Sequence, residues 1–145
     1  MIRAPQAVLF ACNLNAVRSP MAENLFKRRF AGRVFVDSCG VRAGETDPLM
    51  VSVMEELGID LSRHRPKNFE TVHDASWDLI VTLTPQAHHR ALEAVRTLAI
   101  DVEYWPTMDP TDTEGTRDQR LEAYRQVRDA LDRRIADRFA GLKPP

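Results

Sequence analysis

Short apolar runs recur along the chain, and longer stretches with a helical spacing of apolar residues separate them. Such short runs, bounded by polar or turn-forming residues, are typical of buried β-strands. Four of them are predicted to be strands: Ala7–Ala11, Val34–Ser38, Leu79–Leu83 and Val102–Trp105.

Three of the helical stretches begin with a residue that caps helices well, followed directly by proline. Proline suits the first helical position because the N–H that it lacks would have no partner there. The three predicted starts are Ser19-Pro20, Asp47-Pro48 and Thr84-Pro85.

The apolar positions of two helices predict which face each of them buries. The helix after Asp47 should bury one face and stop at Gly58. A last helix should run from about Arg117 to Phe139. The predicted buried residues are Leu49, Val53, Met54 and Leu57 in the former, and Leu121, Tyr124, Val127, Leu131 and Ile135 in the latter.

Strands that alternate with helices predict an α/β fold, in which right-handed crossovers join parallel strands. We therefore expect one domain, residues 1–145, with a doubly wound, four-stranded parallel sheet flanked by helices. Ligands of such sheets bind beyond the carboxyl ends of the strands. Cys12 follows the first predicted strand directly, so its position fits a functional site.

Composition narrows the class of protein further. The chain has 145 residues, a formal net charge of −1 and only two cysteines, Cys12 and Cys39. A near-neutral chain argues against a general nucleic-acid or membrane-surface binder. Two cysteines form no disulfide framework and indicate a reducing compartment, and the start of the chain lacks the apolar core of a signal peptide. A cytoplasmic protein is expected.

The stretch from Cys12 to Ser19 predicts a phosphate-binding loop. The thiolate is the reactive form of cysteine, and a helix N-terminus or a fixed cation favours it. Backbone N–H groups at a helix start bind anions, and Arg18 offers a fork of donors that matches two phosphate oxygens. Ser19 could hydrogen-bond the sulfur. The predicted phosphate-binding residues are Asn13, Leu14, Asn15, Ala16, Val17, Arg18 and Ser19.

Each of these residues also has a plainer explanation. A free cysteine that ends a strand is most often a small buried side chain. Asp-Pro pairs, such as those at Asp47 and Asp109, often mark ordinary turns or helix starts. His88 and His89 are adjacent on a predicted helix and share no metal-binding face. No metal-ligand spacing occurs, so neither a metal nor another cofactor is predicted.

With the Cys-x5-Arg-Ser pattern after its first strand, the sequence resembles the low-molecular-weight protein tyrosine phosphatases and the arsenate reductases built on the same fold. The resemblance implies that Asp109 protonates the leaving group and then activates water. It also implies that Asn15, Ser19, Ser38 and His64 brace the loop. It covers almost the whole chain through "VLFACNLNAVRSPMAENLFKRR", "VDSCG", "VMEELGIDLSRHRPK", "DLIVTL" and "YWPTMDPTDTEGTRDQRLEAYRQVRDALDRRI".

The chain departs from the pattern of this family at several positions. Leu14 stands where the family usually has glycine, so strain or a different loop path is expected there. Val17 replaces the second cysteine that many of the phosphatases carry. Thr111 replaces an aromatic wall of the pocket, which predicts modest selectivity for phosphotyrosine. Thioredoxin-coupled reductases have cysteines after the third strand, whereas this chain has Thr84 and no cysteine in that stretch.

These features predict a cysteine-dependent phosphomonoesterase with Cys12 as nucleophile, Arg18 as phosphate ligand and Asp109 as acid and base. The expected substrate is a phosphorylated protein, a small aryl phosphate or an inorganic oxyanion. An arsenate reductase that uses an external low-molecular-weight thiol is the alternative, and a non-catalytic phosphate-binding module is a third reading. Strand alternation should turn Cys39 away from Cys12, and the sequence leaves the oligomeric state open.

Overall fold

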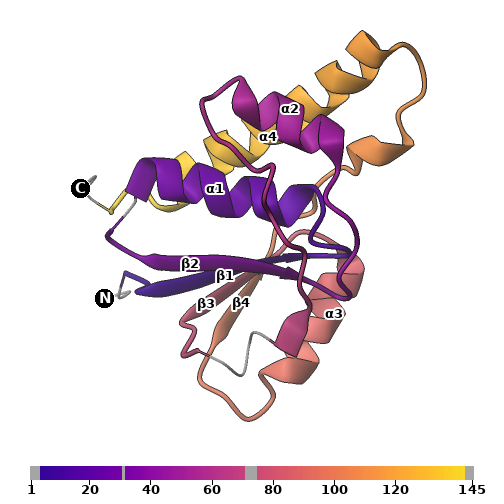
Figure 1. Cartoon of the computed structure of the whole chain (residues 1–145). Helices are drawn as coiled ribbons and strands as arrows, with labels where there is room; N and C mark the ends of the chain where they lie inside the picture. The colour runs from indigo at the N-terminus through magenta and orange to yellow at the C-terminus, as the bar shows by residue number, and fades with distance from the viewer. Residues whose placement is uncertain (1–3, 31, 71–74, 143–145) are drawn as a thin grey trace.

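The computed structural model describes residues 4–30, 32–70 and 75–142 of the chain. Four strands form one parallel sheet in the order β2-β1-β3-β4 (Figure 1). They are β1 Ala7–Cys12, β2 Phe35–Gly40, β3 Leu79–Thr82 and β4 Asp101–Tyr104. The predicted α/β fold with a parallel sheet is confirmed, and the strand ends lie within two residues of the predicted ones.

Helices cover both faces of this sheet, as a doubly wound fold requires. Helices α1, α2 and α4 lie on one side, and α3 lies on the other (Figure 1). Their bounds are α1 Arg18–Phe30, α2 Pro48–Glu55, α3 Pro85–Ala94 and α4 Arg117–Arg138, with a short 3-10 helix, η2 Pro110–Asp112, before α4. Among the described helices, none is both long and apolar enough to cross a membrane.

The pleat of β1 divides the interior into two hydrophobic cores. Alternate residues of this fully buried strand face opposite sides of the sheet. Val8, Phe10 and Cys12 belong to the core under α1 and α4, whereas Ala7, Leu9 and Ala11 belong to the core under α3. Cys12 therefore ends the strand on the side of the larger helical layer.

Two of the predicted helix caps are present, and one prediction was wrong. Asp47 accepts hydrogen bonds from the N–H groups of Leu49 and Met50, and Thr84 accepts one from Ala87. Ser19 is not a cap, because α1 already begins at Arg18 and the Ser19 hydroxyl turns inward. That hydroxyl is held by the loop before the helix instead of by the helix backbone.

The ends and faces of the other helices differ only slightly from the prediction. Helix α2 ends at Glu55, and the turn that follows closes at Gly58, whose φ of +77° suits glycine. Leu49 and Leu57 are only partly buried, and Met50 is fully buried instead. The predicted stripe of α4 is buried as expected, together with the charged residue Arg128.

Charged and hydrogen-bonded side chains fasten α2 to α4. Glu56 accepts hydrogen bonds from Arg125 and Arg128, which lower its pKa to about 2. Tyr124 donates to Asp47 at 2.7 Å. Burial, and to a smaller extent this hydrogen bond, raise the pKa of the phenol above its usual range. The pairs of Glu56 hold the end of α2, and the bond to Asp47 holds its start, which borders the cleft described below.

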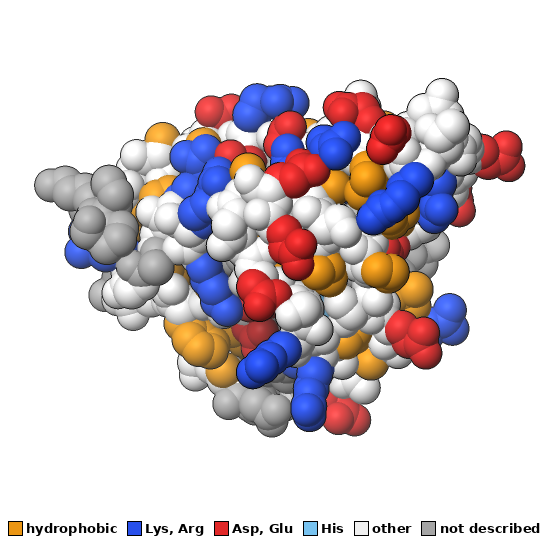
Figure 2. Space-filling view, turned by 45° about the horizontal axis from the view of Figure 1, so that its top comes forward, with side chains coloured by type: hydrophobic (Ala, Val, Ile, Leu, Met, Phe, Trp, Pro, Cys, Tyr) orange, Lys and Arg blue, Asp and Glu red, His pale blue; other side chains and the backbone are white. Residues whose placement is uncertain are grey.

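The outer surface carries both signs of charge. Figure 2 shows acidic and basic side chains interspersed over the face that it presents, without one dominant sign. Some surface charges are paired, since Arg28 and Arg29 of α1 both contact Asp132 of α4.

The depressed pKa of Glu56 predicts how stability depends on pH. An unfolded glutamate has a pKa of about 4.3, so Glu56 stabilises the fold above that pH, and the contribution is lost as the pH falls toward 2. The Tm difference between wild type and Glu56→Gln should be constant from about pH 7 to about pH 5 and shrink below it. Glu55→Gln, an exposed neighbour, should show no such trend. A difference that persists unchanged at pH 2 would contradict the assignment.

Candidate active site

The loop between β1 and α1 is held from outside through its carbonyl groups. N–H groups of the segment after β2 donate to four of these carbonyls over N···O distances of 2.8–3.4 Å. The pairs are Val41 to Cys12, Arg42 to Asn13, Gly44 to Leu14 and Asp47 to Ala16. The segment after β2 thus surrounds the loop and fixes the outward direction of its carbonyls.

Because the carbonyls point outward, the N–H groups of the same peptides point inward. Within the described residues, the N–H groups of residues 14–18 donate to no protein acceptor. They lie directly before α1, whose N-terminus adds the positive end of the helix dipole. Converging N–H groups at a helix start form a binding site for a tetrahedral anion.

Asn15 makes the reversal of the loop possible. Its φ of +53° is the only positive value at a non-glycine residue in the described chain. Its amide nitrogen donates to Ser19 and Ser38, and its amide oxygen accepts from the N–H of Lys67. His64 Nε2 lies 2.8 Å from the Asn15 carbonyl. All four residues that the family resemblance named as loop braces therefore meet here.

Cys12 lies at the floor of this loop. It is 2% exposed, and its Sγ lies 2.9 Å from the hydroxyl of Ser19. A hydroxyl at this distance can donate a hydrogen bond to a thiolate, which stabilises the charged form of the sulfur. The geometry is suited to a nucleophile that later becomes a leaving group.

Arg18 and Asp109 close the site from above. Arg18 Nη1 donates to the carbonyl of Thr107 at 3.0 Å, and Nη2 lies 3.8 Å from Asp109 Oδ2. The other carboxylate oxygen of Asp109 accepts from the N–H and the hydroxyl of Thr111. Oδ2 is therefore the oxygen of Asp109 that faces the loop and could exchange a proton with a bound substrate.

A cleft of about 820 Å³ opens over these residues. Cys12, Arg18 and Asp109 line it together with the predicted loop residues Asn13, Leu14, Ala16 and Val17. Its walls are aliphatic at Leu14, Val41 and Leu49, and polar at Arg42, Glu45, Gln86 and Arg120. None of the described residues that line it is aromatic, in agreement with the missing aromatic wall that the sequence predicted.

The expectation of strain at Leu14 was wrong. The positive φ falls on Asn15, and Leu14 is partly exposed with its side chain against Gly44. A Cβ on Gly44 would lie 2.8 Å from the Cβ of Leu14, and one on Gly40 would lie 2.7 Å from the N of Asn15. The glycines that the loop needs therefore lie in the segment packed around it.

Cys39 lies on the other side of the sheet from Cys12. It is fully buried in the core under α3, next to Ala11 in the register, and burial raises the pKa of its thiol. The neighbouring Ser38 points to the opposite face, toward Asn15. The predicted direction of Cys39 is confirmed.

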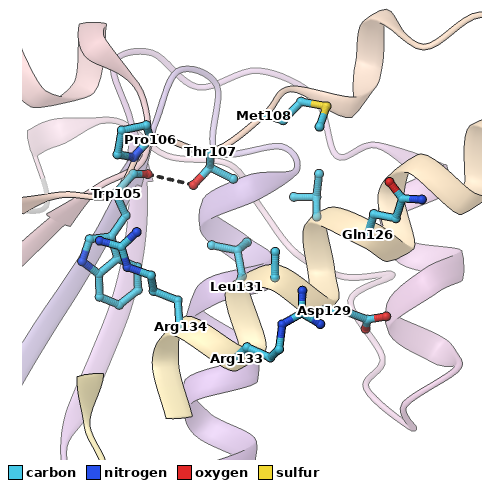
Figure 3. Close-up of a pocket in the computed structure, with 11 residues that line it drawn as sticks. Trp105, Pro106, Thr107, Met108, Gln126, Asp129, Leu131, Arg133 and Arg134 are labelled. Carbon is cyan, nitrogen blue, oxygen red and sulfur yellow. Dashed lines mark hydrogen bonds between the residues drawn. The ribbon is translucent and has the colours of Figure 1, made fainter. Parts of the chain in front are cut away.

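A second cavity, of about 500 Å³, lies beside the residues that follow β4 (Figure 3). Residues 105–108 form one wall, and α4 forms the other. Figure 3 shows Arg134 against the ring of Trp105, to which its guanidinium carbon lies 5.0 Å away. The described residues that line this cavity include neither cysteine nor histidine, whereas Cys12 lines the cleft above the loop.

Several contacts of the site were missed by the sequence analysis. Thr84 was assigned only as a helix cap, yet its hydroxyl also donates to Asn13 at 2.7 Å and so ties α3 to the loop. Thr107 and Lys67 contribute backbone groups, which carry no signal in the sequence. Glu23 could have been noticed, because it is a carboxylate between the buried positions Ala22 and Leu25.

Among the described residues, no group of three or more histidine, cysteine, aspartate or glutamate side chains could hold a metal ion. At the loop itself, Arg18 and the loop N–H groups are available to an anion, and Arg42 and Arg120 add positive charge in the walls of the cleft.

A parallel sheet that ends in a cysteine-containing anion loop defines a class of enzymes that act on phosphate or a similar oxyanion. The chain belongs to the low molecular weight phosphotyrosine protein phosphatase family, whose sequence pattern matches residues 7–144.

Relatives within this class have different activities. The chain is 31% identical over 135 residues to the glutaredoxin arsenate reductase of Synechocystis sp., a match that covers 93% of this chain and 97% of that protein. The fold superposes on the tyrosine phosphatase amsI of Erwinia amylovora with a TM-score of 0.77 at 20% identity, covering 97% and 95% of the two chains. The YwlE arginine phosphatase of Geobacillus stearothermophilus gives a TM-score of 0.75 at 26% identity, covering 94% and 92%.

The left-handed conformation of Asn15 can be separated from its side-chain contacts by a pair of substitutions. Asn15→Gly and Asn15→Ala both remove the amide, but alanine also meets the steric cost of a positive φ. The alanine variant should be less stable than the glycine variant by about 1 kcal/mol in urea unfolding. At Asn13, whose φ is not positive, the order should reverse, with glycine the less stable. Equal stabilities of the two variants at position 15 would contradict this explanation.

Proposed function

We propose that the chain is a phosphomonoesterase that works through a phosphocysteine intermediate. One observation carries the proposal: the sulfur of Cys12 lies at the centre of a loop whose N–H groups point inward, with Arg18 and Asp109 above it. Such a site stabilises three equatorial oxygens while leaving one axial direction for the sulfur and the other for a leaving group.

In the proposed first step, the Cys12 thiolate attacks phosphorus, so that an S–P bond forms as the ester P–O bond breaks. The leaving oxygen takes its proton from Oδ2 of Asp109, the carboxylate oxygen that faces the loop. Arg18 exchanges its hydrogen bond to the Thr107 carbonyl for bonds to two phosphate oxygens.

In the proposed second step, Asp109 removes a proton from a water molecule, which attacks the phosphorus of the phosphocysteine. The P–O bond to water forms, the S–P bond breaks, and inorganic phosphate leaves. Ser19 stabilises the departing thiolate through its hydrogen bond to Sγ. No cofactor takes part, and Cys12 must remain reduced, so we propose that the protein works in a reducing compartment such as the cytoplasm.

The walls of the cleft, which are partly aliphatic and partly polar, favour a phosphate ester whose leaving group has both apolar and polar parts. Leu14 and Val41 offer apolar area without the flat stacking surface of an aromatic ring. We therefore propose small aryl phosphates and phosphorylated proteins as substrates, with modest preference for phosphotyrosine peptides.

Arsenate reduction with an external thiol is the second candidate. The relative from Synechocystis sp. is named a glutaredoxin arsenate reductase, which is the observation in its favour. Reduction of arsenate needs two electrons, which thiols supply by forming a disulfide, so a second sulfur must reach Cys12. Cys39 is the only other cysteine of the chain and faces the opposite core, so the second sulfur would have to come from outside.

The role of Asp109 predicts a dependence on the leaving group. Asp109→Asn should slow hydrolysis of alkyl phosphates by about a hundredfold or more, and that of activated aryl phosphates far less, because a good leaving group needs little protonation. Asp112→Asn, in the 3-10 helix that Asp109 caps, is the matched control and should stay near wild type. Equal loss for both kinds of ester, measured as kcat/KM, would assign Asp109 a structural role.

Parallel assays separate the two candidate functions. The wild type and Cys39→Ala should both hydrolyse p-nitrophenyl phosphate, and Cys12→Ser should not. With arsenate and reduced glutathione, we expect no arsenite production above that of Cys12→Ser. The phosphatase proposal fails in favour of the reductase if p-nitrophenyl phosphate is inert while arsenite forms in a reaction that requires Cys12 and glutathione.

A further inference from the structure

Glu23 is a buried carboxylate to which the proposed mechanism assigns no role. It lies on α1 and is 7% exposed. One carboxylate oxygen accepts a hydrogen bond from the Ser38 hydroxyl at 2.6 Å, and the other pairs with the ammonium group of Lys27 one helical turn further on. A buried carboxylate is costly unless such partners compensate it, so its presence in this core needs an explanation.

A continuous chain of hydrogen bonds joins Glu23 to the sulfur of Cys12. From Glu23 the chain passes through Ser38 to the amide nitrogen of Asn15, 2.9 Å from the Ser38 hydroxyl. The same nitrogen donates to the hydroxyl of Ser19 at 2.8 Å, and that hydroxyl lies 2.9 Å from Cys12 Sγ. Helical spacing supports this arrangement, because Ser19, Glu23 and Lys27 lie on one face of α1.

The donors and acceptors along this chain have a fixed order. An ionised carboxylate only accepts, so the proton of Ser38 points to Glu23 and its lone pairs accept from Asn15. Each N–H of the Asn15 amide is then used, one by Ser38 and one by Ser19. Ser19 therefore accepts from Asn15 and keeps its own proton for Cys12 or for the carbonyl of Cys39, 3.2 Å away.

The opposite orientation of the Asn15 amide would remove this proton from the sulfur. If the amide oxygen faced the two serines, both hydroxyls would donate to it, and Ser19 would have no proton for Cys12. That state loses the hydrogen bond from Ser38 to Glu23 as well as the bond from the N–H of Lys67. Glu23 and Lys67 together exclude it.

We propose that Glu23 is a positioning residue that holds the Asn15 amide in the orientation in which Ser19 donates to the Cys12 thiolate. The inference deepens the proposed function, since it concerns how the proposed nucleophile is kept ionised. Its measurement uses only the thiol, however, and needs no substrate.

Glu23→Gln tests the proposal because the ammonium group of Lys27 should choose the orientation of the new amide. Lys27 only donates, so it should attract the glutamine oxygen and leave the NH2 group facing Ser38. The proton of Ser38 would then lose its acceptor unless the Asn15 amide turned its oxygen toward the two serines. This turn would also withdraw the Ser19 proton from Cys12. The midpoint of the pH profile of Cys12 alkylation by iodoacetamide should rise by about one pH unit.

The direction of this shift excludes a purely electrostatic effect. Removing the negative charge of Glu23 would by itself favour the thiolate and lower the midpoint. An unchanged or lowered midpoint in Glu23→Gln, with alkylation assigned to Cys12 by mass mapping, would overturn the proposal.

Two further variants serve as controls. Lys27→Met alone removes a positive charge but keeps the bond from Ser38 to the carboxylate, so the midpoint should rise less than in Glu23→Gln. Combining Glu23→Gln with Lys27→Met frees the glutamine oxygen to face Ser38, so the midpoint should return toward the wild-type value. A double variant that behaves like Glu23→Gln alone would refute the orientation argument.

A measurement on the unaltered protein keeps the proposal testable if Glu23→Gln does not fold. In NMR spectra, the side-chain NH2 protons of Asn15 should show NOEs to the β-protons of Ser19 and Ser38. NOEs to the N–H of Lys67 in place of these would show the flipped amide and refute the proposal. If the assays above showed no phosphatase activity, the alkylation profile and the NMR measurement would still be interpretable, because neither needs a substrate.

Discussion

The left-handed backbone of Asn15 is the constraint on which the rest of the site depends. A loop that leaves a strand and enters a helix can turn its N–H groups inward only if one residue reverses the chain, and that residue has a φ of +53°. Asparagine tolerates this region better than most residues. Hydrogen bonds from the Asn15 amide to Ser19 and Ser38, and from the N–H of Lys67 to its amide oxygen, hold it there.

The order of the strands supplies those partners from several parts of the chain. Because β1 lies between β2 and β3, the ends of both neighbours flank the loop that follows it. The end of β2 provides Ser38, and Gly40 there lets the loop backbone at Asn15 approach closely. The segment after β3 provides Thr84. Parallel strands bring these residues to one edge of the sheet, so the topology itself assembles the cleft.

The sequence was sufficient for the parts of this structure that depend on local patterns. Apolar runs predicted the strands, and Asp47 and Thr84 predicted two helix starts. Ser19 was assigned wrongly as a cap, because a Ser-Pro pair has the same local signature whether its hydroxyl serves the helix or a neighbouring sulfur. The carbonyl of Thr107, which holds Arg18, could not be predicted. Every residue has the same backbone carbonyl, and only the tertiary structure decides which one lies next to Arg18.

The pleat of the sheet also limits the chemistry that the chain can perform alone. Cys12 ends β1 on the side of α1, and Cys39 near the end of β2 faces the core under α3. Phosphoryl transfer to water needs one sulfur, whereas reduction of an oxyanion by thiols needs two. Strand alternation separates the two sulfurs by the thickness of the sheet, and the shift of the Cys39 pKa toward the neutral thiol makes that residue a poor nucleophile as well. This separation agrees with the proposed phosphoryl transfer, whereas reduction by this chain would require a thiol that enters the cleft from solvent.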